Sequence, residues 1–226
     1  MNELSSPPAN PFSELYAAYA AGTLDPAYAL MVETQCALRP DVRRSVGASE
    51  ALAGGLLETA AATSLSVGAL DRAFAAIDVL EAAPRKDAAA QPGRLEPGDE
   101  LDTLPEPARG AARDAAGREG WKWLSPGLKR LAIDAGSPME VELYRIEPGS
   151  RIPRHTHSGP EYTLVLSGGF TDERGSYGPG DMCLNTPDDT HTPVADDDGV
   201  CYALAIREGG LRFSGMLGTL QRLFGG

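Results

Sequence analysis

The chain lacks the features that mark membrane and secreted proteins. No apolar run in its 226 residues approaches the roughly 18–20 residues of a membrane-spanning helix, so we expect no membrane partner. Residues 1–15 have neither the basic start nor the apolar stretch of a secretory signal. The three cysteines are odd in number and widely separated, which indicates no disulfide framework. We therefore expect a cytoplasmic protein.

Basic residues are also scarce. The chain has 20 Lys and Arg against 32 Asp and Glu, a formal net charge of −12. Nucleic-acid binding needs clustered Lys and Arg, so we expect no direct contact with nucleic acid and a neutral or basic partner instead. With 42% hydrophobic and 23% charged residues the composition is that of a globular protein, and the length suits one large or two small domains.

Residues 1–83 predict a small helical bundle, because Ala, Leu, Glu and Arg dominate and β-branched runs are scarce. We expect helices over residues 11–21 and 26–38, a third capped by Ser45 or Ser49 and running to about 61, and a fourth opened by Ser64 or Ser66. Short loops between such helices are typical of a bundle. Its expected core consists of Leu15, Tyr19, Leu24, Leu30, Leu57, Leu70, Phe74 and Ile77.

Residues 84–120 separate this region from the rest. The stretch from Ala83 to Pro107 is rich in Pro, Gly, Ala and charge, and it predicts an extended linker. The small and charged residues that follow favour no particular structure. The expected domains are therefore a helical domain at 1–83, a linker at 84–120 and a third unit at 121–226.

From Trp121 onward the pattern indicates strands separated by Pro- and Gly-containing turns. Many short strands of this kind favour a sandwich or barrel, which makes the whole chain an α+β multidomain protein. A short helix over Gly215–Phe224 is weakly indicated. The expected strands are Trp121–Leu124, Lys129–Asp134, Glu140–Ile146, Glu161–Leu166, Met182–Leu184 and Val200–Arg207.

All three histidines lie within 37 residues, at positions 155, 157 and 191. Side chains alternate along a strand, so His155 and His157 share one face, and Glu161 follows four residues later. Three imidazoles and a carboxylate suit zinc, iron, manganese, nickel or copper. We predict that His155, His157, Glu161 and His191 bind one divalent metal ion, zinc by preference, with iron, manganese or nickel as alternatives. A chance grouping of exposed or core histidines is the other interpretation.

The sequence around the four expected ligands indicates roles for two aspartates and two cysteines. Asp188 and Asp189 are candidates to orient His191, because metal-bound histidines donate their second N–H to an acceptor. The interpretation that we favour is that both are solvated turn residues. Cys183 and Cys201 lie on expected strands. We interpret both as buried structural thiols rather than redox groups.

The spacing of these residues resembles the first motif of the cupin superfamily, written Gly149-x5-His155-x-His157-x3-Glu161-x6-Gly168. Gly180 to His191 resembles the second motif less closely, since Pro187 is shifted by one place and Ala195 replaces the usual asparagine. The resemblance implies a conical antiparallel barrel over Trp121 to Phe213, with a metal ion in its mouth.

Nearly the whole chain is similar to the ChrR-type anti-sigma factors. The resemblance rests on the two-part layout and on the stretches 16–24, 161–173, 177–181 and 191–195. It implies that the N-terminal helices inhibit an extracytoplasmic-function sigma factor. It also implies that the cupin half releases this factor under singlet-oxygen or related oxidative stress.

One departure from that family concerns the N-terminal half. The family usually binds a second zinc ion there, through an upstream histidine and a His-x3-Cys-x2-Cys motif. Those positions hold Asn10, Gln35, Arg39 and Val42 here, and Cys36 stands alone. One thiol cannot supply the four ligands of a structural zinc site, so we expect this domain to fold without metal.

The leading hypothesis is therefore an anti-sigma factor with a metal-binding sensor domain. Residues 1–83 carry ten acidic side chains and four arginines, a net charge of −6, which would complement a basic sigma factor. A metal-dependent cupin enzyme, a dioxygenase or isomerase acting on a small molecule, is the alternative, although no separate general base is evident. A small-molecule-binding regulator without catalysis is the third hypothesis.

Overall fold

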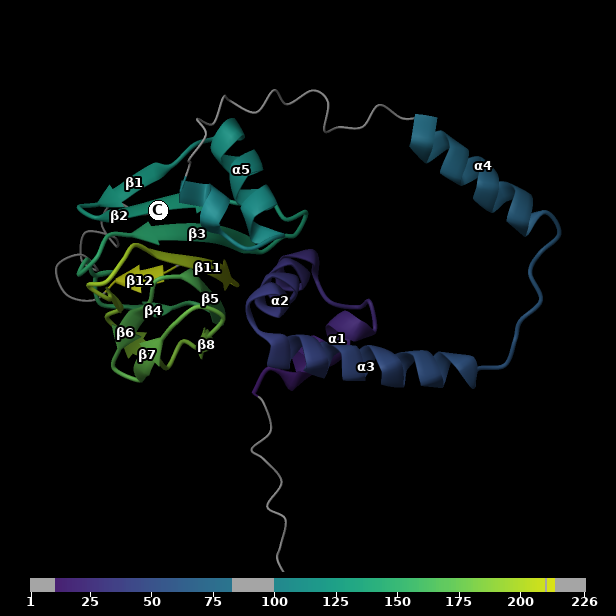
Figure 1. Ribbon diagram of the computed structural model, residues 1–226, viewed down its shortest axis with the longest axis horizontal. Coiled ribbons are helices and arrows are strands. Elements are labelled where there is room, and N and C mark those ends of the chain that lie inside the picture. The colour runs from purple at the N-terminus through teal and green to yellow at the C-terminus, as the bar shows by residue number, and fades with distance from the viewer. Residues whose placement is uncertain (1–10, 83–99, 210, 214–226) are drawn as a thin grey trace, which may run out of the picture.

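The computed structural model describes residues 11–82, 100–209 and 211–213, and it places N-terminal helices before an antiparallel β region (Figure 1). The predicted α+β class is confirmed. Asn10, the expected helix over Gly215–Phe224 and residues 84–99 of the expected linker lie outside the described residues.

The first three helices are α1 (Ser13–Ala20), α2 (Pro26–Leu38) and α3 (Pro40–Glu58). Asp25 caps α2 by accepting a hydrogen bond from the Ala27 N–H at 2.9 Å, and Pro26 takes the first helical position, as predicted. The prediction for α3 was wrong at its start. Arg39 is extended, so it ends α2, and Pro40 begins the next helix at once rather than Ser45 or Ser49.

The helical bundle is smaller than expected. Tyr16, Val32, Val42 and Val46 form its buried core, with Leu15, Tyr19 and Leu24 packed at the edge. Helix α4 (Ala69–Ala82) has no buried residue and stands apart from the other described elements (Figure 1). Leu57, Leu70, Phe74 and Ile77 are therefore not core residues, contrary to the prediction: they are 47–76% exposed. Among the described helices, none is long and apolar enough to cross a bilayer.

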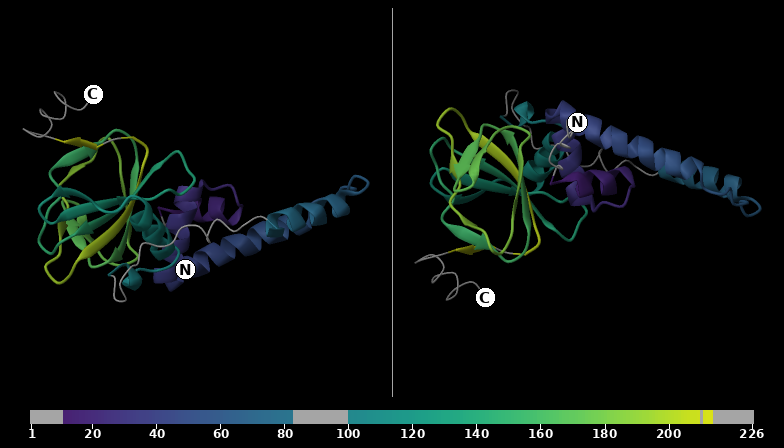
Figure 2. Two further views of the ribbon diagram at one scale, coloured as in Figure 1. Left: turned by 90° about the horizontal axis from the view of Figure 1, so that it is seen from above. Right: turned by 90° about the horizontal axis from the view of Figure 1, so that it is seen from below.

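The strands agree with the six predicted ones within one or two residues at each end, and further short strands join them. Within the described residues they form three antiparallel sheets, ordered β1-β2-β3-β11-β5-β8, β10-β6-β7 and β12-β4-β9. Figure 2 shows the strands gathered beside the N-terminal helices. Their bounds are β1 Lys122–Ser125, β2 Leu128–Ala132, β3 Glu140–Ile146, β4 His155–His157, β5 Glu161–Ser167, β6 Phe170–Asp172, β7 Gly175–Tyr177, β8 Met182–Asn185, β9 Thr190–His191, β10 Val194–Ala195, β11 Cys201–Arg207 and β12 Leu211–Phe213.

Strand β11, at the centre of the six-stranded sheet, is buried on both faces, which explains its nearly continuous apolar run. Along β11, Leu204 and Ile206 pack toward the helices, whereas Ala203 and Ala205 face the interior of the β region. Since side chains alternate along a strand, each central strand links the helical layer to this interior.

Residues 100–118 form part of the helical layer, although the sequence assigned them to the predicted linker. The 3₁₀ helix η2 (Glu100–Thr103) buries Leu101, and α5 (Ala108–Arg118) buries Ala108, Ala112 and Ala115 against the sheet (Figure 1). Small alanines let this helix approach closely. The domain boundaries at 83 and 120 stay a prediction.

Helix α2 lies against the same face and is bonded to the β region along its length. The Ser137 hydroxyl donates to the Asp25 carboxylate at 2.7 Å, and the Tyr28 hydroxyl donates to Glu208 at 3.2 Å. At the other end, Arg39 forms a 2.8 Å ion pair with Asp181. The two parts of the chain therefore share a continuous interface.

Gly180 allows the close approach at this end of α2. Its φ of +86° favours glycine, and a Cβ atom there would lie 2.5 Å from Cγ of Arg39. Any larger residue would push the helix away from the turn between β7 and β8.

Candidate metal centre

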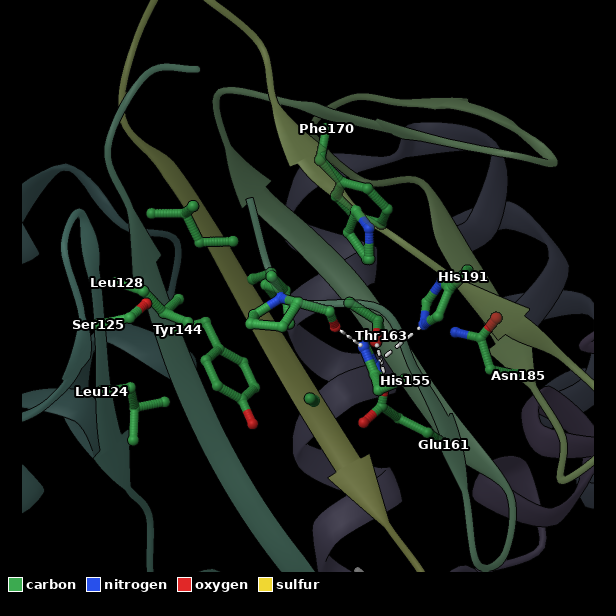
Figure 3. Close-up of a pocket in the computed structure, with 16 residues that line it drawn as sticks. Leu124, Ser125, Leu128, Tyr144, His155, Glu161, Thr163, Phe170, Asn185 and His191 are labelled. Atoms are coloured by element: carbon green, nitrogen blue, oxygen red, sulfur yellow. Dashed lines mark hydrogen bonds between the residues drawn. The ribbon is translucent and has the colours of Figure 1, made fainter. Parts of the chain in front are cut away.

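Three short segments bring the four predicted residues together. His155 and His157 point inward from β4, Glu161 begins β5, and β9 pairs with β4 so that His191 lies opposite His155. The four side chains are buried, and their potential ligand atoms all lie within 4.8 Å of one another. Figure 3 shows His155, Glu161 and His191 converging at one end of a pocket.

The imidazole rings meet through their Nε2 atoms. Nε2 of His191 lies 3.1 Å from Nε2 of His155 and 3.2 Å from Nε2 of His157. The Nδ1 atom of His155 lies 2.8 Å from the Pro153 carbonyl oxygen, which can only accept, so this nitrogen carries the proton. The Nε2 atom of His155 therefore carries a lone pair, on the side of the ring that faces His191.

Asp172 orients the third histidine. Its carboxylate accepts a 2.9 Å hydrogen bond from Nδ1–H of His191, and its side chain is fully buried. Asp188 and Asp189, the candidates named from the sequence, do not have this role. Asp189 instead accepts hydrogen bonds from the backbone N–H and the hydroxyl of Thr186, at 2.8 and 2.9 Å.

Burial sets the protonation of the cluster. It lowers the pKa of His155 to about 4 and the pKa of His157 to about 3, so both rings are neutral at neutral pH. Burial also raises the pKa of Glu161 to about 7, against the opposing effect of the Arg207 guanidinium.

These residues fit a divalent cation. Neutral imidazoles offer lone pairs, and a cation would compensate the buried carboxylate. The Nδ1 atom of His157 is buried and makes no hydrogen bond to any described residue, although the Glu161 carboxylate lies 3.7 Å away. The buried cluster of three histidines and a glutamate therefore suggests a metal site.

A buried ionic network lies next to Glu161, and the sequence did not predict it. Arg207 donates to Glu142 at 2.6 Å and to the Tyr144 hydroxyl at 2.6 Å, and this hydroxyl donates to Glu142. The network holds Nη1 of Arg207 3.8 Å from the Glu161 carboxylate. The signal in the sequence that could have indicated this network is Glu142, a charged residue between the apolar Val141 and Leu143 on β3.

Beside the cluster lies a cavity of about 360 Å³. Its wall is mainly apolar and comes from the six-stranded sheet on one side and from β4, β6 and neighbouring loops on the other (Figure 3). Cys183 and Cys201 are buried and free, as predicted, and neither belongs to the cluster. The arrangement is a buried donor set that opens onto an apolar chamber.

The positions where the resemblance implied a second zinc site are occupied by packing and interface residues. Gln35 is buried, accepts from the Tyr16 hydroxyl at 2.9 Å and donates to the Gly180 carbonyl at 3.0 Å. Arg39 pairs with Asp181, and Val42 lies in the core of the helical bundle.

Comparison with known proteins gives consistent matches. The family model of the ChrR cupin-like domain matches residues 115–208. The anti-sigma-E factor ChrR of Cereibacter sphaeroides is 34% identical over 211 residues, which cover 93% of this chain and 94% of that protein. A crystal structure of Rhodobacter sphaeroides SigE in complex with the anti-sigma ChrR matches with 31% identity and a TM-score of 0.65. That match covers 87% of this chain and 96% of the solved one.

Proposed function

This chain belongs to the family of the anti-sigma factor ChrR, and we propose that it sequesters an extracytoplasmic-function sigma factor in the cytoplasm. The relative ChrR was crystallised in complex with SigE, and this chain matches nearly all of that ChrR chain. The family membership therefore supplies the partner class, and the surface of the helices supports it.

The observation that carries the proposal is an apolar surface on α3, α4 and the segment between them. Leu56 and Leu57 are 65% and 76% exposed, and Val67 is 98% exposed. On α4, Phe74 and Ile77 lie at helical spacing and are 57% and 47% exposed. Exposed apolar side chains in such number mark a region that binds another protein. We call it the α3–α4 surface; its further large members are Leu52, Leu65, Leu70, Val79 and Leu80.

Charge complements this surface. Residues 1–83 carry a net charge of −6. A factor that binds promoter DNA needs basic patches, so an acidic partner would steer the encounter and compete for them.

We further propose that His155, His157, Glu161 and His191 bind one divalent metal ion, zinc by preference, with iron, manganese or nickel as alternatives. The converging Nε2 atoms and the buried carboxylate support this assignment. A bound ion would hold β4, β5 and β9 together, because its ligands come from all three strands.

Strand β5 offers a route from this centre to the helices, as expected of a sensor of oxidative stress. Glu161 faces the metal cluster, and the next residue, Tyr162, faces outward. The ring of Tyr162 contacts that of Tyr28 on α2 edge to face, with centroids 5.1 Å apart. A change in the coordination of Glu161 would therefore displace a residue in the interface with α2.

Binding to the extracytoplasmic-function sigma factors of the same organism tests the proposal. Phe74→Glu and Ile77→Glu place charges in the α3–α4 surface and should weaken binding by at least about tenfold, as expected of central interface residues. Trp123→Glu is the matched control, because Trp123 is 65% exposed but lies on β1. Failure of the wild-type chain to bind, or equal weakening by all three variants, would refute the proposal.

A metal-dependent enzyme is the second candidate, favoured by the cavity beside the cluster. A metal ion with an open coordination position can activate water or oxygen. Oxygen consumption or turnover of a small molecule by the metal-loaded chain, abolished by His155→Ala, would support this alternative.

A further inference from the structure

We propose that the cavity beside the histidine cluster is a binding site for a small, uncharged and mainly apolar molecule that carries one carbonyl oxygen. The inference goes beyond the anti-sigma function, which requires no small ligand. It rests on the wall of the cavity and on one buried amide group.

The wall favours an apolar body. Leu128, Ile146, Ile152, Phe170 and Pro193 all line the cavity, and the inner face of β11 contributes only Ala203 and Ala205. The two alanines leave space that larger residues would fill. A charged group placed against these side chains would lose its hydration without compensation.

The size favours a small molecule. About 360 Å³ is near the lower end of the roughly 300–1,000 Å³ of ligand pockets. Leu124 lines the cavity and is 43% exposed, so the chamber reaches the surface beside β1. The space is therefore accessible from solvent and does not resemble a sealed packing defect.

The polar end of the cavity requires an acceptor from the ligand. The Tyr144 hydroxyl already donates to Glu142, and the Thr163 hydroxyl donates to Glu161. The side-chain NH₂ group of Asn185 differs from these two hydroxyls, because it has no strong acceptor in the part of the chain that the structure describes. Asn185 is fully buried, and it pairs with Glu161 where β8 is hydrogen-bonded to β5.

Arg174 fixes the orientation of the Asn185 amide. Its guanidinium can only donate and lies 2.7 Å from Oδ1 of Asn185, so the NH₂ group must point the other way. Among the described residues, the hydrogen bond of this NH₂ group is to the Cys183 sulfur at 4.0 Å, which is a weak acceptor. Figure 3 shows the amide nitrogen turned toward His155 and His191.

A carbonyl oxygen at this end would accept the unused hydrogen bond of Asn185 beside the cluster. Satisfying a buried donor in this way favours a ketone over the matching hydrocarbon. The donor therefore defines the polarity of the ligand, and the apolar wall defines its body.

Three probes that share one carbon skeleton test the inference on the full chain without a sigma factor. Acetophenone has the carbonyl oxygen, 1-phenylethanol has a hydroxyl, and ethylbenzene has no oxygen. Saturation-transfer NMR titrations should show acetophenone binding about tenfold more tightly than ethylbenzene, the factor expected of one net hydrogen bond. The alcohol should fall between them.

Variants locate the bound probe. Ala203→Leu fills the cavity and should abolish acetophenone binding, whereas Ala111→Leu, on α5 outside the cavity, should leave it unchanged. Asn185→Ala should remove the preference for acetophenone over ethylbenzene. Ile152→Phe is a second cavity-filling variant in case Ala203→Leu does not fold, and thermal unfolding identifies the folded variants.

Two results would overturn the inference. If acetophenone does not bind at millimolar concentration, or binds a folded cavity-filling variant as well as the wild type, the cavity is not the site. If ethylbenzene binds equally well, the assignment of a carbonyl oxygen is wrong. Neither result bears on sigma-factor binding, which is measured separately.

Discussion

Gln35 on α2 donates a 3.0 Å hydrogen bond to the carbonyl oxygen of Gly180, which joins the helical bundle to the β region. The same amide accepts from the Tyr16 hydroxyl inside the bundle. All three groups are buried, so one side chain satisfies partners on both sides of the interface.

Replacing Gln35 should therefore destabilise the chain. Gln35→Ala removes the hydrogen bonds that this amide makes to the Tyr16 hydroxyl and to the Gly180 carbonyl, and we expect a loss of about 1–3 kcal/mol in the free energy of unfolding. Arg39→Ala removes a half-exposed ion pair with Asp181 at the same interface and should cost less than about 1 kcal/mol. Urea unfolding measures both. Equal losses would show that the buried amide has no special role.

Removal of one histidine should empty the metal centre. His157→Ala and His191→Ala each leave only three of the four donors, and we expect the metal content to fall from about one ion per chain to near zero. Cys183→Ala is the control, because this thiol is buried outside the cluster. Mass-spectrometric metal analysis of the purified variants checks this. Full occupancy in either histidine variant would contradict the ligand assignment.

Asp172 should tune the affinity of the site. Asp172→Asn weakens the acceptor of the His191 Nδ1–H group, and second-layer changes of this kind typically reduce metal affinity by about 10–100-fold. Asp189→Asn should have little effect, because Asp189 bonds to Thr186 instead. Competition with a chelator compares the two variants. A larger effect of Asp189→Asn would restore the expectation made from the sequence.

The metal cluster shows which parts of the site the sequence could predict and which it could not. The spacing of His155, His157 and Glu161 on neighbouring strand positions predicted their convergence, because strand alternation is a local rule. Asp172 lies 19 residues before His191 on another strand, and no local pattern joins them. The contact depends on how β6 packs against β9, which only the tertiary structure shows.

Helix α4 and the segment at 100–118 differ from the sequence prediction in opposite ways. Helix α4 was expected to be buried and is exposed, whereas the segment at 100–118 was assigned to the linker and packs on the sheet. The periodic Phe74 and Ile77 indicate an apolar helix face, but this pattern is the same whether a face packs on its own chain or on a partner. Ala108 and Ala112 are too small to signal burial, although they pack tightly on the sheet. Residue size and hydrophobicity alone therefore placed α4 in a core and gave no indication of α5.

The cysteines should differ in reactivity. Burial raises the pKa of Cys183 and of Cys201 to about 12, so thiolate is scarce for both below about pH 10, whereas Cys36 is only half-buried. Iodoacetamide at pH 8 should label Cys36 alone in the folded chain and all three in urea. Peptide mapping by mass spectrometry checks this, and rapid labelling of Cys183 or Cys201 in the folded chain would argue for a redox role.

Transcription by RNA polymerase that contains the extracytoplasmic-function sigma factor bound by this chain tests the central claim most directly. We expect the wild-type chain to suppress run-off transcription at equimolar concentration, and oxidant to restore it. The His157→Ala variant should still suppress transcription but respond poorly to oxidant, because its helical surface is intact and its metal centre is not. Undiminished transcription in the presence of excess wild-type chain would contradict the account.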